Sequence, residues 1–388
     1  MRSVRGFKRA VAAATLSASV VLLAHAAPAH AESAGTVIAV RAQPDGWHGM
    51  SGGSTVEYWM ADSAGTPRPA SGSLFVPAGP PPPDGWPIMA FDHGTAGLGP
   101  GCGGQADPAK YPYPVAMARQ DEIIRHLVQQ GFAVVAPDYL GLGLFDTGPH
   151  PYLGIRTEAT STIDLVRAVR SVRPELSRTW GVIGVSQGGQ AALGTGHLQQ
   201  TYAPDLDFRG TIAIDPESDV EKVLPLAGPL IPAVANTQGL MSFFVSILAG
   251  LRAERPDLDV DRYLTPQGKA VLDDIGPLCL DRIIARVAGL GVGDILAQPL
   301  ADDRIRTGLD AYLTVPTAGY DAPILLLLNV TDTIVPSPLH AALATQLAAN
   351  RVDFQVVTGT GRHCELNPQM EAAMDAFLAR IRSTPTQR

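Results

Sequence analysis

Short apolar runs alternate with amphipathic stretches through most of the sequence, and this alternation limits the fold more than any other feature. Apolar runs of strand length lie at residues 87–92, 133–137, 180–185, 210–214, 323–329 and 353–357. Segments with helical periodicity lie between or after them, at residues 120–130, 157–172, 188–198 and 370–381. Strands that alternate with helices pair in parallel, because a crossover helix connects them over one face of the sheet. The order therefore predicts the α/β fold class, with a mostly parallel central sheet flanked by helices.

The segment that precedes these runs has a different pattern. Residues 36–40, 55–60 and 71–76 are short strand-like runs separated by turns that contain Gly, Pro and Asp. Consecutive strands joined by short turns pair in the antiparallel sense. We expect them to form an antiparallel meander at the edge of the sheet.

The strand pattern stops after residue 216 and resumes near residue 323. Residues 217–315 contain helical runs, among them 240–251 and 266–287, but no convincing strand. A stretch of about one hundred residues is too long to be a plain loop in a compact domain. We therefore predict a helical cap at 217–315, inserted into an α/β core formed by residues 32–216 and 316–388.

The first 31 residues have the features of a secretory signal peptide. A basic head precedes an apolar stretch at residues 10–24, and a small-residue cleavage site follows at Ala29-His30-Ala31. The apolar stretch is too short and too weakly hydrophobic for a stable membrane span, although an uncleaved membrane anchor is the alternative interpretation. We expect residues 1–31 to be removed and the protein to be secreted to the extracellular medium.

Removal of this segment leaves an acidic chain. Residues 1–31 hold four basic residues and no acidic one, so the remainder has 25 basic and 37 acidic residues and a net charge of −12. Binding to nucleic acid needs the opposite charge, so we expect no nucleic-acid partner.

The cysteine count limits both disulfides and metal sites. Cys102, Cys279 and Cys364 are the only cysteines. Export permits one disulfide among them and leaves one thiol over. No CxxC pair or histidine-rich cluster has the spacing of a zinc site, so we expect no metal, and the chemistry below requires no cofactor.

The sequence Gly184-Val185-Ser186-Gln187-Gly188 lies between a predicted strand and a predicted helix. In that context a GxSxG pattern predicts a nucleophilic serine on a sharp turn, with glycines where a side chain would collide. The backbone N–H of Gln187 then faces the oxyanion that forms during acyl transfer. The alternatives are a structural serine and a phosphate-binding loop, although the glycine patterns of phosphate loops are absent here.

A serine alcohol needs a base and an orienting acid, which follow it in the order acid, then histidine, in this fold. Asp332 comes just after an apolar strand, and His363 lies in the loop after the last strand. Asp215, at the end of another strand, is the rival for the acid, whereas Asp138 is better placed to accept hydrogen bonds in a turn. The other histidines considered are more often structural or part of a pocket wall: His93, His150, His197 and His340.

The second oxyanion donor is expected in the loop after the strand at 87–92. That loop begins His93-Gly94-Thr95 and is rich in glycine. The Thr95 N–H is the candidate donor, and a merely flexible glycine loop is the alternative.

Several of these segments together resemble the secretory lipase family of α/β-hydrolases, the group that includes fungal lipase A. The resemblance runs from about residue 70 to residue 375 and rests on these segments: His93-Gly94-Thr95, Val134-Val135-Ala136-Pro137-Asp138-Tyr139-Leu140-Gly141-Leu142-Gly143, His150-Pro151-Tyr152-Leu153, the Ser186 turn and Asp332-Thr333-Ile334-Val335-Pro336.

The resemblance implies an α/β-hydrolase fold and a secreted carboxylic ester hydrolase that acts on lipid esters, with a helical cap over the site. It assigns Ser186 as nucleophile, Asp332 as orienting acid and His363 as base, with the Thr95 and Gln187 amides as oxyanion donors. It also implies a disulfide between Cys102 and Cys279, because family members tether the His-Gly loop to the cap in this way.

The sequence therefore predicts a serine esterase or lipase that forms an acyl-enzyme intermediate. A peptidase or an acyltransferase on the same fold is the alternative, as is a binding protein that has lost catalysis. We expect a lipid or small acyl-ester substrate and a monomeric chain. The apolar run at 240–248 is expected either to make transient contact with a lipid interface or to pack as a helix against the core.

Overall fold

The computed structural model describes residues 32–43 and 47–383. The predicted signal peptide, residues 1–31, lies outside the described residues. In the part of the chain that the structure describes, no helix combines the length and the apolar character needed to cross a membrane.

The described residues form a mixed sheet with the strand order β1-β2-β3-β5-β4-β6-β7-β8-β9. The strands are β1 (Thr36–Ala42), β2 (Gly53–Ala61), β3 (Pro67–Phe75), β4 (Trp86–Asp92), β5 (Ala133–Pro137), β6 (Leu176–Val185), β7 (Asp207–Ile214), β8 (Ile324–Asn329) and β9 (Phe354–Gly359). The first three strands form the antiparallel edge, and the strands from β4 to β9 pair in parallel. The predicted α/β class and the antiparallel edge are confirmed.

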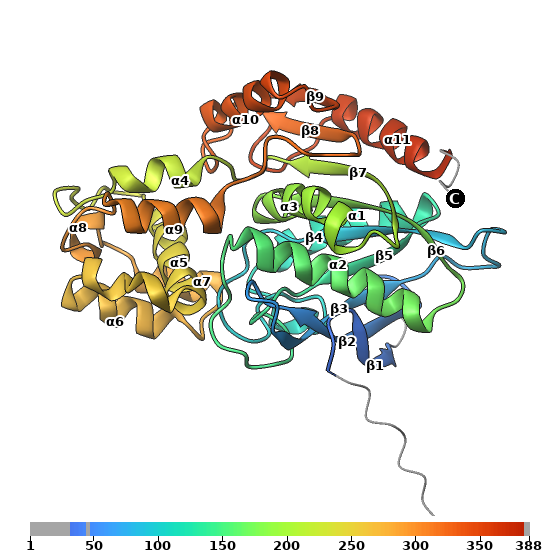
Figure 1. The fold of residues 1–388 in the computed structure, drawn as a ribbon, viewed down its shortest axis with the longest axis horizontal. Helices are drawn as coiled ribbons and strands as arrows, with labels where there is room; N and C mark the ends of the chain where they lie inside the picture. Colours follow the sequence, from blue (N-terminus) through green and yellow to red (C-terminus); the bar gives the residue numbers. More distant parts are fainter. Residues whose placement is uncertain (1–31, 44–46, 384–388) are drawn as a thin grey trace, which may run out of the picture. The chain divides into compact units, whose positions relative to one another are not determined.

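Helices cover both faces of this sheet (Figure 1). They are α1 (Pro114–Gln129), α2 (Ile155–Val172), α3 (Gln187–Tyr202), α10 (Ser337–Ala349) and α11 (Pro368–Ser383). Alternate strand residues point to opposite faces, so neighbours in β4 enter different cores. Ile88 packs in the apolar cluster that contains α2, whereas Met89 packs in the cluster that contains α1 and α11. These two layers hold the carboxyl ends of the parallel strands in fixed positions.

Residues 217–315 lie between β7 and β8 and form helices at one end of the sheet (Figure 1). The helices are α4 (Val220–Val223), α5 (Gln238–Glu254), α6 (Pro266–Ile275), α7 (Leu280–Arg286), α8 (Val292–Ile295) and α9 (Asp303–Leu313), joined in part by short 3₁₀ turns. They share an apolar cluster that also includes Leu98 and Tyr152 of the core. We call residues 217–315 the inserted segment.

The helical run predicted at residues 266–287 differs from the structure. Residues 266–287 form two helices rather than one, α6 and α7, with a break at residues 276–279. Pro277 explains the break, because proline has no N–H to donate and its ring collides with the preceding turn of a helix. The break places Cys279 at the amino end of α7.

A disulfide joins Cys102 in the loop after β4 to Cys279 in the inserted segment. This is the pairing that the resemblance implied, and Cys364 is a free thiol. Backbone hydrogen bonds reinforce the contact, from Leu98 N to Leu278 O and from Leu280 N to Ala96 O, each 2.9 Å long. The loop that begins His93-Gly94-Thr95 is therefore tied to the inserted segment both covalently and by hydrogen bonds.

The disulfide should contribute strongly to stability, because its cysteines are 177 residues apart in sequence and the bond restricts the unfolded chain. We expect the Cys102→Ala/Cys279→Ala double variant to lose about 2–5 kcal/mol of unfolding free energy, measured by urea unfolding. Cys364→Ala, which removes a cysteine but no disulfide, is the control. An unchanged unfolding midpoint in the double variant would contradict this expectation.

Candidate active site

Ser186 lies at the junction of β6 and α3, with backbone angles of φ 57° and ψ −121°. This conformation is strained for a residue other than glycine. The turn has no space for side chains on either side. A Cβ at Gly184 would lie 1.8 Å from Gly188 O, and a Cβ at Gly188 would lie 1.9 Å from Asp92 O. The glycines of the GxSxG pattern are therefore required by close backbone approach.

Ser186, His363 and Asp332 form a hydrogen-bonded chain at the carboxyl edge of the sheet. The Ser186 Oγ to His363 Nε2 distance is 2.8 Å, and the His363 Nδ1 to Asp332 Oδ2 distance is 2.6 Å. A carboxylate can only accept, so Nδ1–H donates to Asp332, and Nε2 is left to accept from the Ser186 hydroxyl. The structure thus brings together the three residues that the sequence placed far apart.

The electrostatics of these three residues favour an ionised Asp332 and stabilise the imidazolium that His363 becomes when its Nε2 takes a proton. Burial is the largest single influence on the pKa of Asp332 and raises it, but the hydrogen bond and charge of His363 and two backbone N–H groups together outweigh burial, and the net shift is downward. Burial is likewise the largest single influence on the pKa of His363 and lowers it, but the hydrogen bonds and electrostatic attraction to Asp332 and Cys364 together outweigh burial, and the net shift is upward. The other oxygen of Asp332 accepts the N–H groups of Ile334 and Val335, at 2.8 and 3.2 Å. Asp332 is thus held in place as an anion.

Asp215, the rival for the acid, has a different set of partners. Its carboxylate accepts from the backbone and side-chain nitrogens of Asn329, both at 2.7 Å, and from the Cys364 N–H at 2.7 Å. It therefore ties β7 to β8 and to the loop that carries His363. Asp215 supports the position of the histidine rather than pairing with its ring.

The loop that begins His93-Gly94-Thr95 lies against the nucleophile. A Cβ built on Gly94 would be 3.6 Å from Ser186 Cβ. The His93 Nδ1 donates to Gly94 O at 2.7 Å, which fixes the turn. Among the described residues the Thr95 N–H has no hydrogen-bond partner. The Gln187 N–H begins α3, where the first amides of a helix lack partners within the helix.

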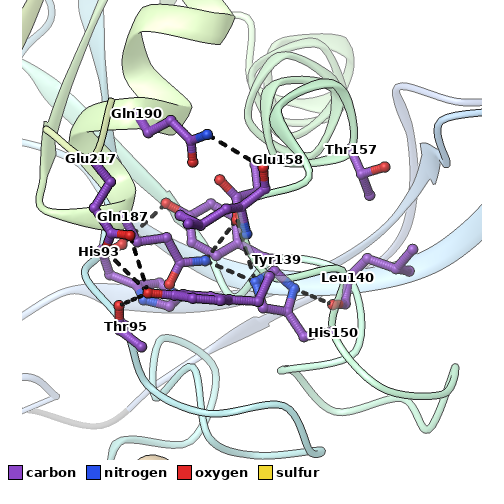
Figure 2. A network of polar contacts seen from close by, with 12 residues as sticks. His93, Thr95, Tyr139, Leu140, His150, Thr157, Glu158, Gln187, Gln190 and Glu217 are labelled. Atoms are coloured by element: carbon purple, nitrogen blue, oxygen red, sulfur yellow. Dashed lines mark hydrogen bonds and ion pairs between the residues drawn. The ribbon is translucent and has the colours of Figure 1, made fainter. Parts of the chain in front are cut away.

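A buried polar network holds the side chain of Gln187 (Figure 2). Its Nε2 donates to Glu158 Oε1 at 2.7 Å and to His150 Nε2 at 2.8 Å, while His150 Nδ1 donates to Leu140 O at 2.9 Å. Burial lowers the pKa of His150 to about 4, which matches its accepting role, and raises the pKa of Glu158 to about 8. Glu158 was not predicted from the sequence, because it looks like an ordinary polar position in an amphipathic helix.

A second missed carboxyl group, Glu217, lies beside the nucleophile. Its Oε1 is 3.5 Å from Ser186 Oγ, and Tyr152 OH donates to it at 3.1 Å. The Tyr152 hydroxyl also contacts Thr95 Oγ1 at 2.9 Å, so Tyr152 connects the side chains of Glu217 and Thr95. Burial raises the pKa of Glu217 to about 7. The sequence feature that could have indicated Glu217 is its position just past the end of β7, where Asp215 was a predicted candidate instead.

Glu217 is also part of the lining of a cavity of about 440 Å³. The other lining residues are all apolar and come from the inserted segment and from the turn after Asp332: Val220, Val223, Leu224, Leu240, Phe243, Phe244, Ile247, Ile334, Val335, Pro336, Pro338 and Leu339. A cavity of this size is within the range of small-molecule sites. The cavity has room for an apolar acyl chain beside Glu217, whose carboxyl group is 3.5 Å from Ser186 Oγ.

Within the described part of the chain, two groups of side chains have ligand atoms within 4.8 Å of one another, as a metal site requires. They are Asp215, His363 and Cys364, and Asp215, Asp332 and His340. In both groups the Asp215 carboxylate already accepts three N–H groups. Because His363 and Asp332 also bond to each other, neither group fits a metal without breaking existing hydrogen bonds.

Comparisons with known proteins found a related sequence and similar solved structures. A protein of Mycobacterium tuberculosis named a probable inactive lipase is 26% identical over 254 residues, which is 63% of this chain and 53% of that protein. The chain thus spans about half the length of this curated relative.

Solved structures match over more of the chain. Lipase A of Candida antarctica in its closed state has a TM-score of 0.74 at 19% identity, covering 92% of this chain and 84% of that one. The rice cell wall degrading esterase LipA of Xanthomonas oryzae has a TM-score of 0.67 at 20% identity, covering 90% and 97%. At these identities the likeness shows a shared fold, the α/β-hydrolase fold.

The family comparison is decisive because it covers most of the sequence. The family described as secretory lipase matches residues 113–387, which include Ser186, Asp332 and His363. By this match the chain belongs to the secretory lipase family, a family of lipases and esterases.

Proposed function

We propose that this protein is a serine carboxylic ester hydrolase that cleaves lipid or other acyl esters through an acyl-enzyme intermediate. The observation that carries the proposal is the hydrogen-bonded chain from Ser186 through His363 to Asp332, next to an apolar cavity. Such a chain activates a serine alcohol, which is otherwise a weak nucleophile.

In the proposed reaction, each of these groups has its own step. Ser186 Oγ attacks the ester carbonyl carbon while His363 Nε2 takes its proton, and Asp332 stabilises the resulting imidazolium. The Gln187 and Thr95 amides stabilise the oxyanion of the tetrahedral intermediate. His363 then gives its proton to the departing alcohol, and later activates the water that releases the acid from Ser186.

The mycobacterial relative carries "inactive" in its name, and that word describes the relative. In this chain all three side chains of the proposed triad are present and within hydrogen-bond distance. The contacts support an active enzyme.

Ser186→Ala should abolish ester hydrolysis, because it removes the nucleophile. We expect kcat for a p-nitrophenyl ester to fall about 10⁴–10⁶-fold, and a fluorophosphonate probe to label the wild type but not the variant. Ser177→Ala is a matched control, since Ser177 lies at the opposite, amino end of β6 and bonds only to the backbone of Thr179. Ester hydrolysis retained by Ser186→Ala would show that the mechanism is wrong.

Asp332→Asn tests the role of the acid. Only neutral His363 can act as a base, so activity should be lost as pH falls through the pKa of His363. Loss of the Asp332 anion lowers that pKa, so the acidic limb of the kcat/KM profile should move to lower pH, while kcat falls about 10⁴-fold. A profile that stays in place with unchanged kcat would exclude Asp332 as the orienting acid.

We also propose contact with a lipid interface near the mouth of the cavity. Most of the apolar run at 240–248 is buried in the inserted segment, but Leu240 is half exposed and lines the cavity. Several apolar side chains of the inserted segment that precede this run are more exposed than Leu240, among them Leu226, Leu230 and Val234. Exposed apolar groups close together in sequence favour adsorption to lipid.

Interfacial binding should appear as a rise in activity when a long-chain ester forms an emulsion. The measurement compares short and long acyl esters below and above the solubility limit. Leu230→Ser, which changes the most exposed of these side chains, at 94%, should weaken the rise without changing hydrolysis of a soluble ester. A rate that follows only the dissolved ester concentration would contradict interfacial contact.

Secretion is proposed on the predicted signal peptide and is supported by the disulfide, which forms in oxidising compartments. Protein recovered from the culture medium should begin at Glu32 when its amino terminus is sequenced. Protein that stays with the cell membrane and retains residues 1–31 would indicate an anchor instead.

A further inference from the structure

The Glu217 carboxyl group has no role in the proposed mechanism, although it lies 3.5 Å from the nucleophile oxygen. Its residue is 7% exposed, and every other residue that lines the adjoining cavity is apolar. Burial of a carboxyl group among apolar side chains is costly unless hydrogen bonds compensate for the lost water. A group kept in such a place next to a reacting centre is a candidate for substrate recognition.

The hydrogen bonds of Glu217 leave part of its accepting capacity unused. A carboxylate offers about four acceptor positions. The Tyr152 hydroxyl donates to the carboxylate, at 3.1 and 3.4 Å from its two oxygens, and so occupies one of these acceptor positions. The Ser186 hydroxyl is turned to His363, at 2.8 Å, so its long contact with Glu217 supplies no proper donor. The site can accept a further hydrogen bond from a molecule in the cavity.

The position of Glu217 indicates which part of the substrate it faces. In the tetrahedral intermediate, the oxyanion lies toward the Gln187 and Thr95 amides, and the leaving alcohol lies toward His363 Nε2. The remaining substituent is the acyl chain, and the cavity that Glu217 shares is the apolar space left for it. The carbons next to the ester carbonyl are then the ones within reach of the carboxyl group.

We propose that Glu217 is a specificity-determining residue that accepts a hydrogen bond from a hydroxyl on the α- or β-carbon of the acyl chain. The preferred substrates are esters of hydroxy fatty acids, whose apolar remainder fills the cavity. A hydroxyl suits this cavity better than an ammonium, because the apolar walls could not replace the water that a full charge would lose. The inference rests on the proposed ester hydrolysis and extends it to a substrate class.

The test compares kcat/KM for the methyl esters of octanoic, α-hydroxyoctanoic, β-hydroxyoctanoic and ω-hydroxyoctanoic acid. We expect the wild type to prefer the α- or β-hydroxy ester at least tenfold over octanoate, and not to prefer the ω-hydroxy ester, whose hydroxyl lies too far along the chain. In Glu217→Leu, the ratio of kcat/KM for the hydroxy ester to kcat/KM for the octanoate ester should be close to one. Glu217→Gln, which nearly preserves shape and replaces the carboxyl with a weaker acceptor, should reduce it and guards against a folding defect in the leucine variant.

Tyr152→Phe separates recognition from structural support. It removes the hydrogen bond that holds Glu217 but leaves the carboxyl group in the cavity, so the preference for the hydroxy ester should persist even where kcat falls. A wild type that hydrolyses all the esters equally, or Glu217 variants that keep the full preference, would overturn the inference and leave ester hydrolysis intact. A wild type that hydrolyses none of them would overturn the proposed function itself.

Discussion

The turn at Ser186 is the constraint on which the rest of the site depends. A left-handed residue between a strand and a helix is unfavourable, and here it is held by the Ser186 N–H to Ile214 O bond of 2.9 Å and by the first turn of α3. The hydrogen bond to Ile214 depends on β6 and β7 lying side by side in a packed sheet. The strain at one residue is thus offset by the core of the whole domain, and it directs the hydroxyl out of the sheet toward His363.

Around this turn, carboxyl groups differ in role because their surroundings differ. Asp332 is held as an anion by His363 and two backbone N–H groups. Glu158 and Glu217 are buried with fewer donors, and their pKa values are raised. Asp215 accepts three N–H groups and acts as a link between strands. Side chains of the same chemical type therefore provide charge, recognition and structural support within one sheet edge.

Much of this arrangement could be predicted from the sequence. The strands are short, apolar and well separated, so their positions and their parallel pairing followed from local pattern. The order of Ser186, Asp332 and His363 followed from strand ends, and the strands bring these ends together. The helix predicted at 120–130 was only part of α1, which begins at Pro114, although proline is suited to the first turn of a helix.

The parts that escaped prediction depend on contacts between distant segments. Glu158 and Glu217 look unremarkable in sequence, because their burial results from α2, α3, the residues just before α2 and the start of the inserted segment meeting at one place. The periodicity of residues 266–287 suggested one helix, and only the backbone break at Pro277 separates it into two.

The Cys102–Cys279 bond has a consequence for motion as well as for stability. It fastens the inserted segment to the short stretch of chain that also carries the Thr95 amide. A displacement of α7 would therefore pull on that stretch and shift the Thr95 amide, which is the proposed oxyanion donor. The position of the inserted segment and the geometry of the proposed oxyanion site are thus linked through one covalent bond.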